Sequence, residues 1–207
     1  MTTLIRIVLI FSILLPFFPC ARCFGQLNHI QIKKEVCTYD RTYRGNKLII
    51  HYESDTTEQT SDVGYNLLHF INLPDTAKLK IVSKLLAFEN DTALCCLKVI
   101  SRSFNGIEGC GGRPDGVDRY DIQVDALYMI NRLCWPGFIE AYSCVPVLYD
   151  TKKQTTINND PKKIRIVFEH YIKWCRQCLA NGRISRHFPF NVGRYVWYNG
   201  HNINIAD

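Results

Sequence analysis

The cysteines are the feature that most constrains the fold of this chain. Ten occur among 207 residues, and eight lie beyond residue 23: Cys37, Cys95, Cys96, Cys110, Cys134, Cys144, Cys175 and Cys178. In an exported chain an even number predicts up to four disulfides, with 105 connectivities that spacing alone does not resolve. An oxidising compartment favours paired over free thiols. Adjacent residues on a strand point to opposite faces, so Cys95 and Cys96 are each expected to bond a different partner.

The N-terminal stretch predicts export. Arg6 precedes an apolar run over residues 7–18, which has the length of a signal-peptide core and falls short of the roughly 20 residues that span a bilayer. Small side chains at Ala21 and Cys23 place cleavage before Phe24. We therefore expect a signal peptide at 1–23, rather than a short membrane anchor, and a secreted, extracellular protein over 24–207. No later segment is long and apolar enough to predict a membrane span.

Charge is distributed unevenly along the chain. Residues 24–150 carry 13 Lys and Arg against 16 Asp and Glu, whereas residues 151–207 carry 10 against 3. The basic C-terminal segment predicts either an anionic partner, such as a sulfated polysaccharide or an acidic protein, or simply a solvated basic face. Export argues against nucleic acid as a partner.

Short extended segments dominate the predicted secondary structure. Alternating or continuous apolar runs predict strands over 47–52, 64–72, 94–101, 120–128, 138–149, 164–171 and 195–198. Residues 76–90 fit both helical and strand spacing, and we interpret them as a strand. Polar residues over 54–62 and 151–161 predict loops. The expected fold is therefore mainly β: one disulfide-stapled domain of two antiparallel sheets, as a sandwich or half-barrel.

Trp174 precedes a Cys-x-x-Cys motif formed by Cys175 and Cys178. The same beginning is typical of thioredoxin-like redox sites, which need a thiolate of low pKa at a helix N-terminus. In that fold several helices and strands follow the motif, and here the chain ends 29 residues later. We interpret the pair as structural half-cystines, with oxidoreductase chemistry and zinc binding as alternatives.

Two other patterns suggest sites outside the cysteines. Asp115, Asp118 and Asp121 gather carboxylates beside a glycine-rich loop, and oxygen-rich loops hold calcium, although this spacing matches no EF-hand. Asn90 begins the Asn-Asp-Thr sequon, which predicts an N-glycan on an exposed turn. Hydrolase and nucleotide-binding motifs are absent from the sequence, so we expect no enzyme activity.

Three segments together resemble a known family. Residues 38–50 combine a Tyr-Asp turn with an alternating strand, residues 65–71 precede Cys95, and residues 135–147 run from a Trp-Pro-Gly turn to Cys-Val-Pro-Val. These features are similar to those of the ependymin-related secreted glycoproteins, over roughly residues 37–178. The family's closing segment is matched here only by Asp160 and Pro161, and Cys95/Cys96, Cys110 and Cys134 exceed its usual cysteine set.

The resemblance implies two sheets curved around a deep apolar pocket, calcium-assisted stability and binding of lipids. It also implies one disulfide between Cys37 and Cys144, and another from Cys95 or Cys96 to Cys175 or Cys178. We accordingly expect a non-catalytic glycoprotein that binds a hydrophobic small molecule or lipid between its sheets, in a pocket whose residues the sequence does not identify. The alternative is a cysteine-rich extracellular signalling ligand or decoy that acts through its basic C-terminal face.

Overall fold

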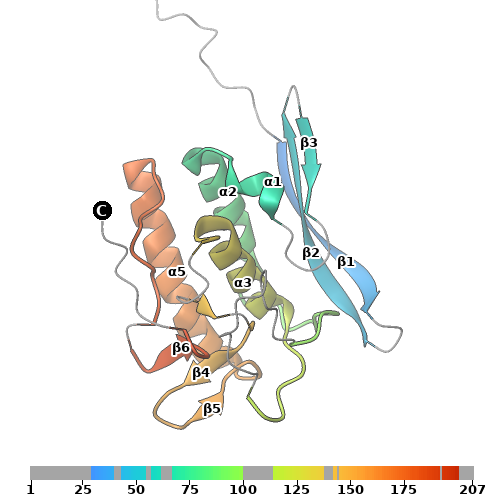
Figure 1. Ribbon diagram of the computed structural model, residues 1–207, viewed down its shortest axis with the longest axis vertical. Coiled ribbons are helices and arrows are strands. Elements are labelled where there is room, and N and C mark those ends of the chain that lie inside the picture. The colour runs from blue at the N-terminus through green and yellow to red at the C-terminus, as the bar shows by residue number, and fades with distance from the viewer. Residues whose placement is uncertain are drawn as a thin grey trace, which may run out of the picture.

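The computed structural model describes residues 29–39, 43–54, 57–61, 67–99, 114–137, 142–143, 145–191 and 193–200. They form two small antiparallel sheets and a set of helices (Figure 1). The first sheet lies on one side of helices α2 and α3, and the second lies near the opposite side of the molecule, below α5. The predicted signal peptide and its cleavage site fall outside the described residues.

The first sheet has β2 (Tyr43–Ser54) at its centre, between β1 (His29–Tyr39) and β3 (Thr57–Thr60). Its long hairpin pairs His29 with Glu53 and Tyr39 with Tyr43. The predicted strand over 47–52 is confirmed within β2, whereas the loop predicted over 54–62 contains β3. Leu48, Ile50 and Tyr52 alternate along β2 and are all buried, so this face of the sheet contributes to the core.

The segment that follows residue 90 binds the sheet to the helices. The backbone of Asn46 donates to Leu94 O at 2.8 Å and accepts from Cys96 N at 2.8 Å, while Cys95 N donates to Tyr120 O at 2.9 Å. The segment lies so close to β2 that a Cβ on Gly45 would come within 2.6 Å of Leu94 O. Glycine is therefore required at this position for steric reasons. Of the strand predicted over 94–101, the described residues 94–99 form only isolated bridges, at Leu94 and Cys95.

A disulfide joins Cys37 to Cys96 beside this contact, with the two Cα atoms 5.9 Å apart. The pairing of Cys37 with Cys144, implied by the family resemblance, is therefore wrong, since Cys37 is already bonded to Cys96. The described thiols of Cys95, Cys175 and Cys178 are unpaired, which also contradicts the implied bond from Cys95 or Cys96 to the Cys-x-x-Cys pair. Cys110 and Cys144 lie outside the described residues.

Three predicted strands are helices in the structure. The segment over 76–90 forms α2 (Asp75–Leu85) and the short η2 (Leu86–Phe88), and the segment over 120–128 opens α3 (Ile122–Cys134). The alternating apolar residues over 120–128 predicted a strand wrongly. Every residue from Ile122 to Asn131 is buried, so α3 has no exposed polar face that would indicate the helical period. A shorter helix, α1 (Leu68–Ile71), replaces part of the strand predicted over 64–72.

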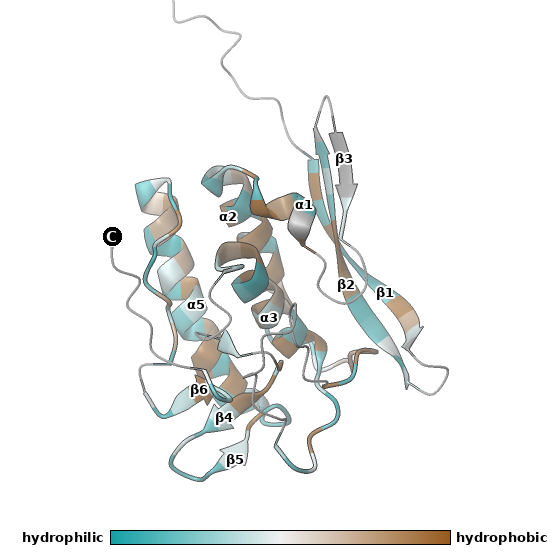
Figure 2. Cartoon of the chain, viewed as in Figure 1, coloured by the Kyte–Doolittle hydropathy of each residue, from teal (hydrophilic) through white to brown (hydrophobic). Residues whose placement is uncertain are grey.

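The third predicted strand that is a helix in the structure is the segment over 164–171, which lies within α5 (Pro161–Asn181). Alternation placed Ile166 in the core, yet that side chain is 40% exposed, whereas Val167 and Tyr171 are buried at helical spacing. The helix begins where the Asp160 side chain accepts from Lys163 N and ends at Gly182, whose φ of 66° is left-handed. Because its buried residues recur at helical spacing, hydrophobic and hydrophilic residues alternate along α5 (Figure 2).

The second sheet has the order β5–β4–β6, formed by β5 (Thr155–Thr156), β4 (Leu148–Asp150) and β6 (Tyr195–Trp197). The predicted last strand is confirmed as β6. A buried hydrogen-bond chain ties this sheet to the helices: Trp197 Nε1 donates to Tyr171 Oη at 2.8 Å, which donates to Asn131 Oδ1 at 2.7 Å. Buried polar groups that satisfy one another in this way fix the relative position of the elements that carry them.

The expected fold class is thus confirmed only in its coarser features. Two antiparallel sheets and a disulfide are present, but more described residues lie in helices than in strands. Helices α2 and α3 pack against the first sheet where the predicted sandwich would have placed the second (Figure 1). One core cluster takes buried residues from both sheets and from helices α1, α2, α3 and α5.

Replacing Cys37 and Cys96 together by serine should lower the free energy of unfolding by about 2–4 kcal/mol, because the bond closes a long loop in the unfolded chain. Urea denaturation followed by circular dichroism measures the loss. Mild reductant should destabilise the wild-type protein more than the double variant, by the contribution of this bond. Equal stability of the two proteins under oxidising conditions would contradict the assigned bond.

Candidate functional site

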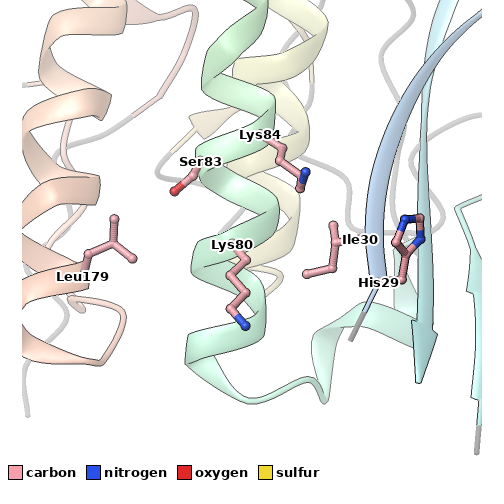
Figure 3. A pocket seen from close by; sticks show the side chains of 6 residues that line it. All are labelled: His29, Ile30, Lys80, Ser83, Lys84 and Leu179. Carbon is pink, nitrogen blue, oxygen red and sulfur yellow. The ribbon is translucent and has the colours of Figure 1, made fainter. Parts of the chain in front are cut away.

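An open groove crosses the outer surface of α2, between α5 and the start of β1 (Figure 3). Its volume is about 460 Å³, and six residues line it: His29, Ile30, Lys80, Ser83, Lys84 and Leu179. Leu179 projects from α5 on one side, and the two β1 residues close the other side. The groove thus brings together three segments that are far apart in the sequence.

The sequence of α2 explains why the lysines reach the groove. Leu79, Val82 and Leu85 face the core, which leaves Lys80 and Lys84 exposed on the opposite side, one helical turn apart. The prediction of a strand over 76–90 missed this arrangement. The helical spacing of Leu79, Val82 and Leu86 in the same segment was the signal that could have found it.

The lining residues carry positive charge beside apolar surface. The two lysine ammonium groups are accompanied by the His29 imidazole, and the described residues that line the groove include no carboxylate. Within the described part of the chain neither Lys80 nor Lys84 forms an ion pair. Like charges four residues apart destabilise a helix by about 0.2–0.5 kcal/mol. An anion bound between them would remove that repulsion.

The apolar part of the groove is formed by Ile30 and Leu179. Ile30 belongs to the core, with only 6% of its surface exposed, whereas Leu179 is 49% exposed and is one of the few large hydrophobic side chains at the surface. The Ser83 hydroxyl donates to Leu79 O at 2.9 Å and approaches the Cys175 Sγ at 3.7 Å. Its hydrogen bonds are therefore made to its own helix and to a buried thiol.

A second open hollow lies between α5 and Glu89, the residue that follows η2, with a volume of about 500 Å³. Its charged lining residues are Glu89, Arg165, Glu169, Lys173 and Arg176, and Arg165 pairs with Glu169 at 3.5 Å. Here the carboxylates offset the cations. The hollow therefore lacks the single-sign charge that distinguishes the groove over α2.

The Cys-x-x-Cys motif does not have the geometry of a thiol redox site. Cys175 and Cys178 lie in the last two turns of α5, far from the helix N-terminus that would stabilise a thiolate. Burial raises the pKa of both thiols. Cys134, at the end of α3, is affected in the same way, and the neighbouring Cys178 and Cys175 raise its pKa further. These thiols are protonated at neutral pH, which disfavours nucleophilic or redox chemistry.

The three aspartates proposed to bind calcium have separate contacts. Asp115 is exposed, Asp118 accepts from Tyr43 Oη at 2.9 Å, and Asp121 caps α3 by accepting from Val124 N at 3.1 Å. Over the described ranges, no three His, Cys, Asp or Glu side chains are gathered closely enough to hold a metal ion. The structure therefore does not bring Asp115, Asp118 and Asp121 together as a ligand set.

The substitution Asp121→Asn tests the structural role of this carboxyl. Burial raises the pKa of Asp121 to about 6, so its ionisation destabilises the fold as the pH rises from about 4 through 6. Asparagine keeps the cap without the charge. Gln123 Nε2 donates to Asp121 Oδ2 at 2.8 Å, so the Gln123 amide must flip for its unpartnered Oε1 to accept from the new amide. We expect the variant to equal wild type below pH 4 and to be more stable at pH 7, measured by urea denaturation. A less stable variant at pH 7 would contradict this role.

The glycosylation sequon lies on an exposed turn, as expected. Asn90 is exposed and has a left-handed φ of 68°, two residues after the end of η2, and Thr92 is also exposed. Asp91, between them, accepts a charged hydrogen bond from Lys34 at 2.6 Å. Occupancy of the site stays a prediction.

Protein expressed through a eukaryotic secretory pathway should therefore carry one N-glycan at Asn90. Treatment with an N-glycosidase should lower its mass by one glycan, and Asn90→Gln should abolish the shift. Thr92→Ala is the matched test, since it removes the sequon but keeps the asparagine. An unchanged mass in wild-type protein would contradict the prediction.

Comparison with protein-family models, curated proteins and solved structures finds no match for this chain. The resemblance to the ependymin-related family therefore remains a prediction. Among the helices of the described residues, none combines the length and the apolar character that crossing a membrane requires.

Proposed function

We propose that this protein is an exported, non-catalytic binding protein for an amphiphile with an anionic head group and a single apolar chain. The observation that carries the proposal is the groove over α2, where Lys80, Lys84 and His29 stand beside Ile30 and Leu179 without a carboxylate. The ligand class is the one expected from the sequence, a hydrophobic or lipid-type molecule, but the proposed site is the groove over α2. The ligand lies between a strand and two helices, instead of between two sheets.

The groove fits such a ligand in size and chemistry. Its volume of about 460 Å³ falls in the range of about 300–1,000 Å³ typical of small-molecule sites. Lysine ammonium groups form charge-assisted hydrogen bonds with a carboxylate or a phosphate monoester. The apolar chain would cover Leu179 and the edge of Ile30, at about 25 cal/mol per Å² of apolar surface removed from water.

Binding without catalysis is favoured by the state of the potential nucleophiles. Ser83, the hydroxyl that lines the groove, donates to a backbone carbonyl in its own helix and has no basic side chain as its acceptor. Cys175 beside it is kept protonated by burial. Nucleophilic catalysis needs a hydroxyl or thiol that is activated by a neighbouring base or by a lowered pKa. Export is supported by the apolar N-terminal run and by the Cys37–Cys96 disulfide.

A second candidate function is that of an extracellular ligand acting through the basic C-terminal segment. Exposed Lys173 and Arg176 on α5 favour it, and an anionic polysaccharide or acidic protein would be the partner. Glu89 and Glu169 in the same hollow weaken the attraction for polyanions. We therefore place this function second.

The double variant Lys80→Gln/Lys84→Gln tests the groove directly. It should weaken binding of a dansyl-labelled fatty acid by about tenfold or more, because two charge-assisted contacts are lost. Lys173→Gln/Arg176→Gln removes the same charge from an exposed helix surface and should leave this binding unchanged. Fluorescence titration at fixed ionic strength measures both. Adding salt should weaken the wild-type complex.

The two candidate functions have opposite outcomes in the same experiment. Loss of heparin binding in the α5 variant, with equal fatty-acid binding in all three proteins, would contradict the groove and favour the surface function. Fatty-acid binding that is insensitive to both substitutions would overturn the assignment to these lysines.

A further inference from the structure

Among the strands of the described residues, β1 lies at the edge of the first sheet. It is eleven residues long and pairs only with β2 in the first sheet. Throughout the described residues, no backbone hydrogen bond connects β1 to any segment other than β2. Alternate backbone N–H and C=O groups along its outer side are therefore available for another strand.

Strand β1 has some of the features that protect a sheet edge and lacks others: Lys33, Lys34 and Glu35 oppose pairing with an arbitrary strand, but the strand is long and unbroken. Val36 is 67% exposed, the highest value among the large hydrophobic residues at the surface. Lys33 and Glu35, on the other face, form no ion pair with any described residue. Natural edge strands are more often short, bulged or interrupted by proline, and β1 has no proline.

We propose that β1 pairs antiparallel with β1 of a second copy of this chain, about a twofold axis through Lys34. Such an interface is isologous, so each residue on one strand faces its complement on the other. A twofold axis perpendicular to the sheet places the same face of both copies on the same side of the combined sheet. Residues directly opposite each other then have side chains on one face only if the axis lies between the two copies of a single residue. The two three-stranded sheets would then form one sheet of six strands.

This register is favoured by the order of residues along the strand. With Lys34 on the axis, Lys33 faces the partner's Glu35, and Ile32 faces the partner's Val36, each pair occurring twice. Opposite charges and apolar pairs directly across an antiparallel ladder each contribute about 0.2–1 kcal/mol. The two Lys34 ammonium groups meet near the axis, but each is paired with Asp91 of its own chain at 2.6 Å.

Neighbouring registers lose these pairs. An axis through Lys33 places two unpaired lysines opposite each other and sets Ile32 against Lys34. An axis through Glu35 places two glutamates opposite each other and sets Val36 against Lys34. Like charges directly opposite one another destabilise a strand pair. The charge pattern of β1 therefore selects one register for self-pairing.

The charge reversals Lys33→Glu and Glu35→Lys test the pairing in combination. Each variant alone creates two like-charge pairs and should self-associate about tenfold more weakly than wild type, or worse. A mixture of the two variants restores both opposite-charge pairs, so a heterodimer should form at wild-type affinity. Sedimentation velocity over a concentration series, with the two variants carrying different fluorophores, distinguishes these species.

The mixing experiment also controls for folding. Glu35 stands opposite Lys47 of β2 in its own chain, so Glu35→Lys could weaken the hairpin. Mixing does not repair that intrachain contact, and recovery of association on mixing therefore reports the interface alone. Circular dichroism of each variant confirms that the monomers are folded.

Two results would overturn the proposal. Wild-type protein that stays monomeric across the concentration series excludes the pairing. Single variants that associate as strongly as wild type would show that the copies meet through another surface or in another register. Neither result affects the test of Lys80 and Lys84 in the groove, since both lysines lie on α2.

Discussion

The contact between Asn46 and the segment over 94–96 is the constraint on which the remainder of the structure depends. On one side the segment exchanges two backbone hydrogen bonds with Asn46, and on the other Cys95 N and Ala93 O bond the backbone that enters α3. Gly45 allows the close approach, and the Cys37–Cys96 bond fixes it covalently. The first sheet and the helical core are thereby joined through one short stretch of chain.

This connection determines where the groove residues stand. Helix α2 precedes the segment, with η2 between them, and the start of α3 is bonded to it through Tyr120 O and Ile122 N, so both helices are anchored against the sheet that carries His29 and Ile30. Helix α5 is held in turn by the Trp197–Tyr171–Asn131 chain, which sets the position of Leu179. Charge and apolar surface meet in the groove because two independent anchors place α2 and α5 side by side.

The sequence predicted the elements whose patterns had one interpretation. The alternating residues of β2, the final strand β6 and the exposed turn at Asn90 were all identified. Helix α5 was missed because Ile164, Ile166 and Phe168 alternate, although Ile164, Val167, Phe168 and Tyr171 also fit a helical stripe. The capping residue Asp160, with Pro161 after it, was the local signal for a helix start. At α3 the residues from Ile122 to Asn131 are buried on all sides by tertiary packing, which the sequence pattern does not show.

The candidate site could not have been predicted in the same way. Its residues come from β1, α2 and α5, and their proximity follows from packing that spacing along the chain does not encode. The disulfide partner of Cys37 was likewise undetermined, because eight cysteines permit many connectivities. The resemblance to a known family supplied a partner, Cys144, that the structure replaces with Cys96.

Native-state hydrogen exchange tests the central role of the segment over 94–96 most directly. The amides of Asn46, Cys95 and Cys96 should exchange only through global unfolding, at the same rate as the amides in the middle of α3. After selective reduction of the Cys37–Cys96 bond, all of them should accelerate together. Exchange of these three amides through fast local opening, with α3 still fully protected, would show that the segment does not join the sheet to the helices.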